Sequence, residues 1–95
     1  LVDVIRCVEH SGEDSVIKEM ALVKIAAGEN ERTAALQIAA HFGAKTVDLT
    51  PTSMILQATG DSAKLDAMIS LLERFRIIEL VRTGKVVMVR GDQVT

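Results

Sequence analysis

The sequence predicts an α+β fold, with two helices on one face of an antiparallel sheet. Two segments carry apolar residues at helical spacing, and the segments between them alternate as strands do. A faint internal repeat supports this order, because Ala26-Ala27-Gly28-Glu29 is echoed by Ala58-Thr59-Gly60-Asp61 and Val47-Asp48-Leu49 by Ile78-Glu79-Leu80. Two such strand–helix–strand units joined by a hairpin at Pro51 form the βαββαβ, or ferredoxin-like, sandwich.

The N-terminal residues are expected to lie outside this sandwich. Leu1–Val8 alternates as a strand does, and the polar stretch His10–Ser15 that follows is rich in turn-forming residues. A strand with no partner before it suggests a fragment, so we expect residues 1–10 to lie outside the domain. Residues 11–18 are expected to be a linker, and residues 19–95 to form the domain itself.

The first half of the domain is predicted from one strand and one helix. Met20–Ala26 alternates, with Ala21, Val23 and Ile25 on one face. Glu31–Phe42 places apolar side chains at helical spacing. Gly43 is well placed to end this helix in the left-handed conformation.

The second half repeats the pattern and adds one strand. Lys45–Thr50 and Ser53–Thr59 flank Pro51, which favours a hairpin turn. A second helix opens at Gly60-Asp61-Ser62, and its apolar residues follow the i, i+3, i+4, i+7 rule. These residues are Leu65, Met68, Ile69, Leu72 and Phe75. The runs 77–83 and 85–90 are expected to pair as a terminal hairpin about Thr83-Gly84-Lys85, which makes the last run an extra C-terminal strand.

Composition narrows the class of protein. The chain has 95 residues, 48% of them hydrophobic, a net charge of −2, and Phe42 and Phe75 as its only aromatic residues. The chain has no excess of positive charge to bind a phosphate backbone and almost no aromatic rings on which nucleotide bases could stack. No nucleic-acid partner is therefore expected. Cys7 is the single cysteine, and neither a signal peptide nor a membrane span is visible, so we expect no membrane partner. A cytoplasmic location is the default, although a plastid or mitochondrial protein without its transit peptide would look the same.

No catalytic constellation emerges from the residues. His10 and His41 are isolated and lack metal-ligand spacing, and Cys7 sits in a strand without an activating base. The sequence therefore predicts no catalytic residue, no metal site and no cofactor in this chain.

A basic cluster near the C-terminus is the remaining candidate site. Its residues are Arg82, Thr83, Gly84, Lys85 and Arg90. Arg74 and Arg76 precede it. One interpretation is a solvated strand edge whose charges discourage aggregation. The other is a docking or anion site, since arginine favours contacts with carboxylates across interfaces.

Several segments together resemble the C-terminal domain of the small, regulatory subunit of acetohydroxyacid synthase (acetolactate synthase). The segments that carry the resemblance are Glu19–Ile25, His41–Asp48, Thr59-Gly60-Asp61, Lys64–Ala67 and Ile78–Gly84. The resemblance implies that residues 1–10 close an ACT domain, and that the chain is not an enzyme. It implies a separate catalytic subunit as partner, which would carry thiamine diphosphate, Mg²⁺ and FAD.

The resemblance also implies a function. Proteins of this family raise the activity of the catalytic subunit and confer feedback inhibition by valine in the biosynthesis of valine, leucine and isoleucine. Their effector site lies mainly between paired ACT domains, so valine is expected to bind the upstream domain. This chain is then a scaffold and contact domain. The alternative is a stand-alone, ACT-like sensor of an amino acid or an anion.

The uncovered face of the sheet is the expected surface for self-association. Two helices on one face leave the other face open, and Leu22, Val47 and Leu56, or their strand neighbours, are expected to present apolar side chains there. This pattern predicts a homodimer.

Overall fold

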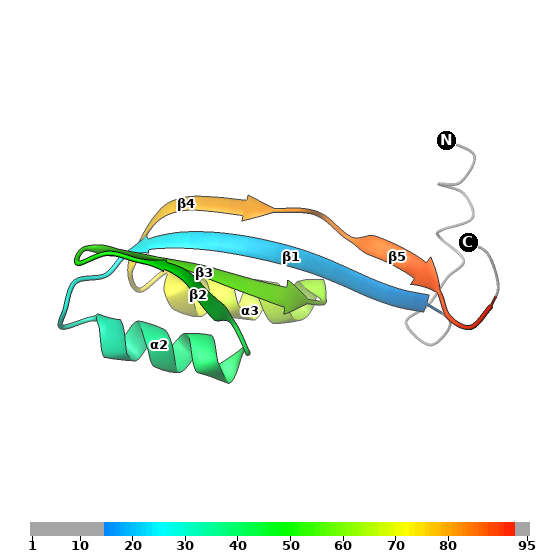
Figure 1. Cartoon of the computed structure of the whole chain (residues 1–95), viewed down its shortest axis with the longest axis horizontal. Coiled ribbons are helices and arrows are strands. Elements are labelled where there is room, and N and C mark those ends of the chain that lie inside the picture. The colour runs from blue at the N-terminus through cyan, green and yellow to red at the C-terminus, as the bar shows by residue number, and fades with distance from the viewer. Residues whose placement is uncertain (1–14, 93–95) are drawn as a thin grey trace.

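The computed structural model describes residues 15–92 and forms an α+β sandwich (Figure 1). The elements are β1 (Ser15–Ala26), α2 (Arg32–His41), β2 (Lys45–Leu49), β3 (Ser53–Gly60), α3 (Ser62–Leu72), β4 (Arg76–Arg82) and β5 (Val86–Val89). Both helices lie on the same side of the sheet, and its other side is bare. The expected strand over residues 1–10 and the first part of the expected linker lie outside the described residues.

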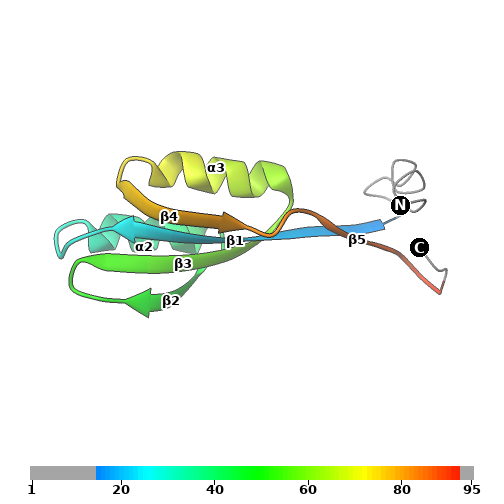
Figure 2. The ribbon, with the colours of Figure 1, turned by 90° about the horizontal axis from the view of Figure 1, so that it is seen from above.

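The sheet has the ferredoxin-like order. Its strands follow one another as β2-β3-β1-β4, and all neighbouring pairs are antiparallel (Figure 2). The two central strands, β1 and β3, therefore come from the two different halves of the repeat. This order confirms the βαββαβ prediction, including the hairpin between β2 and β3.

The core lies between the sheet and the two helices. Alternate residues of the central strands point into it, beginning with Ala21, Val23 and Ile25 of β1, which are fully buried. The remaining core side chains are Ala27, Ala35, Ala39, Met54, Leu56, Ala58, Leu65, Met68, Leu72 and Phe75. Apart from Phe75, this core is aliphatic or sulfur-containing, as the composition predicts. The helix ends also agree, since Gly43 has a φ of 68°.

Strand β1 is longer than expected and extends past the helices as an arm. It begins at Ser15, so residues 15–18 of the expected linker are strand, paired with β5 from Ser15–Val89 to Lys18–Val86. Figure 1 shows this two-stranded arm, formed by the start of β1 and by β5, projecting from one end of the sandwich. Four residues of the predicted linker are therefore part of the folded unit.

The predicted hairpin between the last two strands is wrong. Strands β4 and β5 both pair antiparallel with β1, so they follow one another along the same edge of β1 (Figures 1 and 2). Between the pairs Ala21–Arg82 and Lys18–Val86, the two residues 19 and 20 of β1 face the three residues 83 to 85. The extra residue makes a bulge, and Gly84 adopts the φ of 81° that this bulge needs.

Candidate functional site

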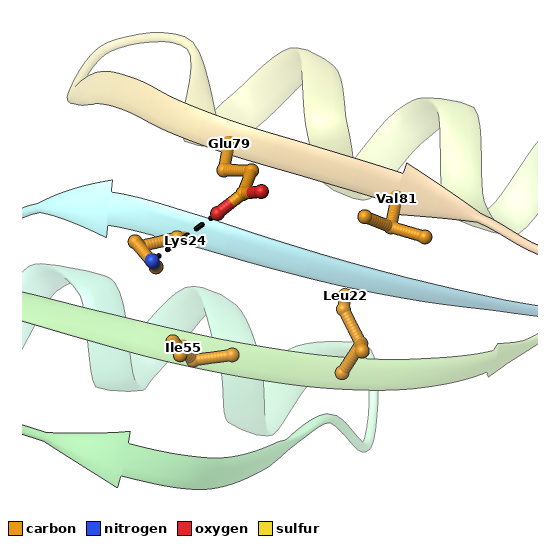
Figure 3. Close-up of a pocket in the computed structure, with 5 residues that line it drawn as sticks. All are labelled: Leu22, Lys24, Ile55, Glu79 and Val81. Atoms are coloured by element: carbon orange, nitrogen blue, oxygen red, sulfur yellow. Dashed lines mark ion pairs between the residues drawn. The ribbon is translucent and has the colours of Figure 1, made fainter.

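The bare face of the sheet carries a shallow apolar groove. Leu22, Lys24, Ile55, Glu79 and Val81 line it and define what is here called the open face (Figure 3). They come from β1, β3 and β4, and the register places Leu22 beside Val81 and Lys24 beside Ile55 and Glu79. The groove has a volume of about 160 Å³. Such a groove is too small to enclose a substrate, and it is suited to receiving side chains of another surface.

One ion pair lies within this apolar surface. Lys24 Nζ is 3.2 Å from Glu79 Oε1, and Figure 3 shows the pair bridging β1 and β4. Both side chains are at least one-third exposed, so water screens the pair and its contribution to stability is small, below about 1 kcal/mol. The pair gives the open face one positive and one negative charge close together.

The arm continues the same face with further apolar side chains. Val16 pairs with Met88, and Lys18 pairs with Val86, so these residues lie on the side of β1 that also carries Leu22. Met88 is 68% exposed and Val86 63% exposed. The exposed apolar surface therefore runs from the body of the sheet onto the arm. Exposed apolar surface of this extent marks interaction sites in soluble proteins.

One of the three residues expected on the open face lies on the opposite side of the sheet, and its strand neighbour, the stated alternative, takes its place. Leu22 is on it as predicted, but Leu56 is fully buried beneath the helices. Strand β3 turns Met54, Leu56 and Ala58 inward, so its open-face residue is Ile55. Val47 lies at an irregularity of the edge strand between Thr46 and Asp48 and is about half exposed.

Arg82 is the centre of an ionic cluster on the other side of β1. Its guanidinium donates two hydrogen bonds to Glu19, from Nε to Oε2 at 2.9 Å and from Nη2 to Oε1 at 3.1 Å. The third nitrogen, Nη1, donates to Asp66 Oδ1 at 2.6 Å. Ser62 Oγ donates a further bond to Glu19 Oε1 at 3.0 Å. The cluster therefore joins β1, the end of β4 and the first half of α3.

Glu19 is a carboxylate in a confined position, with only 7% of its surface exposed. The hydrogen bonds from Arg82 lower the pKa of Glu19 below its ordinary value, against the opposing effect of burial, and Ser62 and the nearby Lys85 add to the lowering. The same contacts with Glu19 and Asp66 raise the pKa of Arg82. Both groups are therefore charged at neutral pH, and each compensates the other.

Replacing Arg82 with methionine is expected to destabilise the domain most at neutral pH. Because the pKa of Glu19 is lowered on folding, wild type keeps this stabilisation above pH 4.5, the ordinary pKa, and loses it as the pH falls through the lowered pKa. In the variant, Glu19 is a buried carboxylate without its arginine partner, which destabilises the fold at pH 7. Protonation of Glu19 in acid removes this charge and therefore reduces the destabilisation. The difference in Tm between wild type and variant should therefore shrink on acidification, measured by thermal circular dichroism from pH 3 to 7.

Lys24→Met is the matched control for this prediction. It also removes one cation from an ion pair across β1 and β4, but its partner Glu79 is largely exposed. A small change in Tm is expected for it. If Arg82→Met gave the same Tm difference at every pH, the contribution of Arg82 would be packing of its aliphatic stem and not compensation of Glu19.

The other residues of the predicted basic cluster occupy the bulge and the arm. Thr83 Oγ1 accepts from the Met20 N–H at 3.1 Å, and the Thr83 N–H donates to the Met20 carbonyl at 3.0 Å. These two hydrogen bonds connect β1 to the segment between β4 and β5, where the regular strand pairing is interrupted. Lys85 and Arg90 lie at the same end of the molecule and line one groove.

The structure does not bring every predicted basic residue together. Arg74 and Arg76 lie at the opposite end of β4 from Arg82, and Arg74 stacks on the Phe75 ring at 5.5 Å. His41 packs edge-on against Phe42 at the end of α2. Cys7 and His10 lie outside the described residues. In the part of the chain that the structure describes, no three metal-ligating side chains gather, and no helix is long and apolar enough to cross a membrane.

Sequence reasoning missed the two acidic partners of Arg82. Glu19 is 63 residues away from Arg82 in the chain, and Asp66 is 16 residues away on α3. The signal that would have found Glu19 is strand register. With Ala21 opposite Arg82, Glu19 occupies the diagonal position on the same face, where long side chains meet.

Comparison with known proteins agrees with this architecture. Residues 18–91 match the family described as the small subunit of acetolactate synthase. This chain belongs to the acetolactate synthase small-subunit family. The acetolactate synthase small subunit of Mycobacterium bovis is 37% identical over 93 residues, 98% of this chain and 55% of that protein. The one of Bacillus subtilis is 35% identical over 92 residues, 97% of this chain and 54% of that protein.

A solved structure supports the same assignment. The small subunit of acetolactate synthase from Thermotoga maritima superposes with a TM-score of 0.75 and 33% identity, over 85% of this chain and 50% of that one. The chain thus spans about half the length of the small subunits it matches. Membership of the small-subunit family does not favour the alternative of a stand-alone small-ligand sensor.

Proposed function

We propose that this chain is the C-terminal, non-catalytic part of a regulatory subunit that binds and activates the catalytic subunit of acetolactate synthase. The match to the small-subunit family over residues 18–91 carries this proposal. The catalytic partner would hold thiamine diphosphate, Mg²⁺ and FAD, and this chain would hold none of them. A cytoplasmic location is in line with the bacterial and archaeal small subunits that the chain matches.

Within such a subunit, the proposed division of labour places valine sensing in an upstream ACT domain. The residues described here would then transmit or support the response and would not bind valine. This role requires an exposed apolar surface that another protein can cover. The arm has such a surface, because Val86 and Met88 are largely exposed there.

The basic residues of the arm are the proposed contacts with the catalytic subunit. Lys85 is exposed there, and Arg90 lies nearby on the same groove. Arg82 is engaged with Glu19 and Asp66, so its proposed part is to hold the bulge in place. Thr83 and Gly84 would shape the backbone between them.

Self-association through the open face is the second part of the proposal. A two-fold axis over this face would bring Lys24 of each copy to Glu79 of the other, while Leu22, Ile55 and Val81 pack together. The face is thus complementary to itself in charge and in apolarity.

Acetolactate production by the purified catalytic subunit tests the regulatory role. It is measured alone, with this chain, and with a longer small subunit that includes the upstream domain, each with and without valine. We expect the longer subunit to stimulate and to respond to valine, and this chain to bind or to activate weakly without valine sensitivity. If neither protein binds the catalytic subunit or changes its rate, the proposed function fails.

A further inference from the structure

A second groove lies on the helix side of the arm, at the N-terminus of α3. Ser15, Ile17, Asp61, Ser62, Ala63, Lys85 and Arg90 line it, and its volume is about 450 Å³. Those residues come from the start of β1, the N-terminus of α3, and the segment that runs from the bulge to the residue after β5. Three segments distant in sequence therefore meet around one space.

The start of α3 contributes two backbone donors to this groove. Ser62 and Ala63 are the first residues of the helix, so their N–H groups have no intrahelical acceptor. The next N–H, of Lys64, is taken by the capping carboxylate of Asp61 at 2.8 Å. Aligned peptide dipoles add about half a positive charge at this end of the helix. Such an end favours negatively charged groups.

A buried hydroxyl gives independent evidence for a ligand. Ser15 is 1% exposed, and its Oγ has no hydrogen-bond partner among the described residues. Buried polar atoms are almost always hydrogen-bonded, and leaving one unsatisfied destabilises the fold. Ser15 lines the groove, so an acceptor bound there would complete its hydrogen bonding.

Positively charged side chains outnumber carboxylates among the residues that line the groove. Lys85 and Arg90 are the two positively charged side chains of the lining, and Asp61 is its one carboxylate. The Asp61 carboxylate accepts a hydrogen bond from the Lys64 N–H and so caps the helix. Beside the groove, the carboxylates of Glu19 and Asp66 share Arg82, and Lys85 also acts on Glu19. The helix end adds to the positive side.

We propose that this groove binds an oxyanion, a carboxylate or a phosphate group, between Lys85, Arg90, the first N–H groups of α3 and the Ser15 hydroxyl. Oxygen acceptors of this kind match lysine, arginine and backbone donors together. The site is distinct from the open face, which lies on the other side of β1. Lys85 and Arg90 are also the proposed contacts with the catalytic subunit, but oxyanion binding is tested on this chain alone, so the two proposals can fail separately.

Titration of the isotope-labelled chain with inorganic phosphate, and separately with acetate, tests the proposal by NMR. We expect saturable shifts of the Ser62 and Ala63 amide signals with at least one of the two anions. Phosphate alone would identify a phosphate site, and acetate alone a carboxylate site. Absence of saturable shifts at these amides with both anions would overturn the proposal.

Three variants make the test specific. Lys85→Gln is expected to weaken binding roughly tenfold, the loss of one charge-assisted hydrogen bond. Ser15→Ala removes an unsatisfied hydroxyl, so it should weaken binding without lowering Tm. Lys18→Gln is the matched control, because Lys18 is a lysine of the same arm that lines a pocket with Met20 and Val86 on the opposite face. Equal weakening by Lys85→Gln and Lys18→Gln would show general charge screening and would refute the site.

Discussion

Replacing Leu56 with alanine is expected to lower the free energy of unfolding by about 3 kcal/mol, because Leu56 is fully buried between β3 and the helices. In a domain of this size, such a loss lowers Tm by roughly 10–20 °C. The chain has no Trp or Tyr, so unfolding in urea is best followed by far-UV circular dichroism.

Ile55→Ala is the control, since it is the next residue of the same strand and faces the open side. It is partly exposed, and its truncation should cost about 1 kcal/mol or less. Measurements at two protein concentrations separate folding from self-association. Equal costs for the two variants would contradict the assignment of faces in β3.

Replacing Val81 with glutamate is expected to raise the dissociation constant of the proposed dimer by about 100-fold or more. Val81 lies on the open face beside Leu22, so the new carboxylate would be buried against apolar side chains of the second copy. It is half exposed in the single copy, so the fold itself should tolerate the change. Sedimentation equilibrium over a wide concentration range measures the effect.

Leu36→Glu provides the comparison for this experiment. Leu36 is also a large apolar residue, 42% exposed, but it lies on α2, on the helix-covered side. It should leave association unchanged. A strictly monomeric wild-type chain at high concentration would reject dimerisation through the open face outright.

Much of the fold was predictable because its signals are local. Helix α3 was found from the spacing of Leu65, Met68 and Leu72, and all three are buried. Asp61 caps this helix as its position suggested. The signal for β3 was also present, since Met54, Leu56 and Ala58 form an unbroken apolar set. Ile55 and Gln57 alternate with these residues and point the other way, so the period of two places Leu56 in the core and its neighbour Ile55 on the open face.

The path of the last strands was not predictable from local sequence. A glycine between two β-rich runs indicates a turn or a bulge equally well, and Gly84 serves the bulge. The choice depends on the length of β1, because an arm that begins at Ser15 offers β5 a partner. The Arg82 cluster was hidden for the same reason, since it requires the register between strands 63 residues apart.

Because β1 pairs with strands from both halves of the chain, its two edges are covered at different times during synthesis. Strand β1 is synthesised before the other described strands, yet one of its two edges is covered only when β4 and β5 have left the ribosome. Until then the backbone groups from Ser15 to Ala26 on that edge are open to pairing with another chain. Folding of this domain is therefore dominated by a late, long-range closure, which makes it slow relative to a helical protein of equal length.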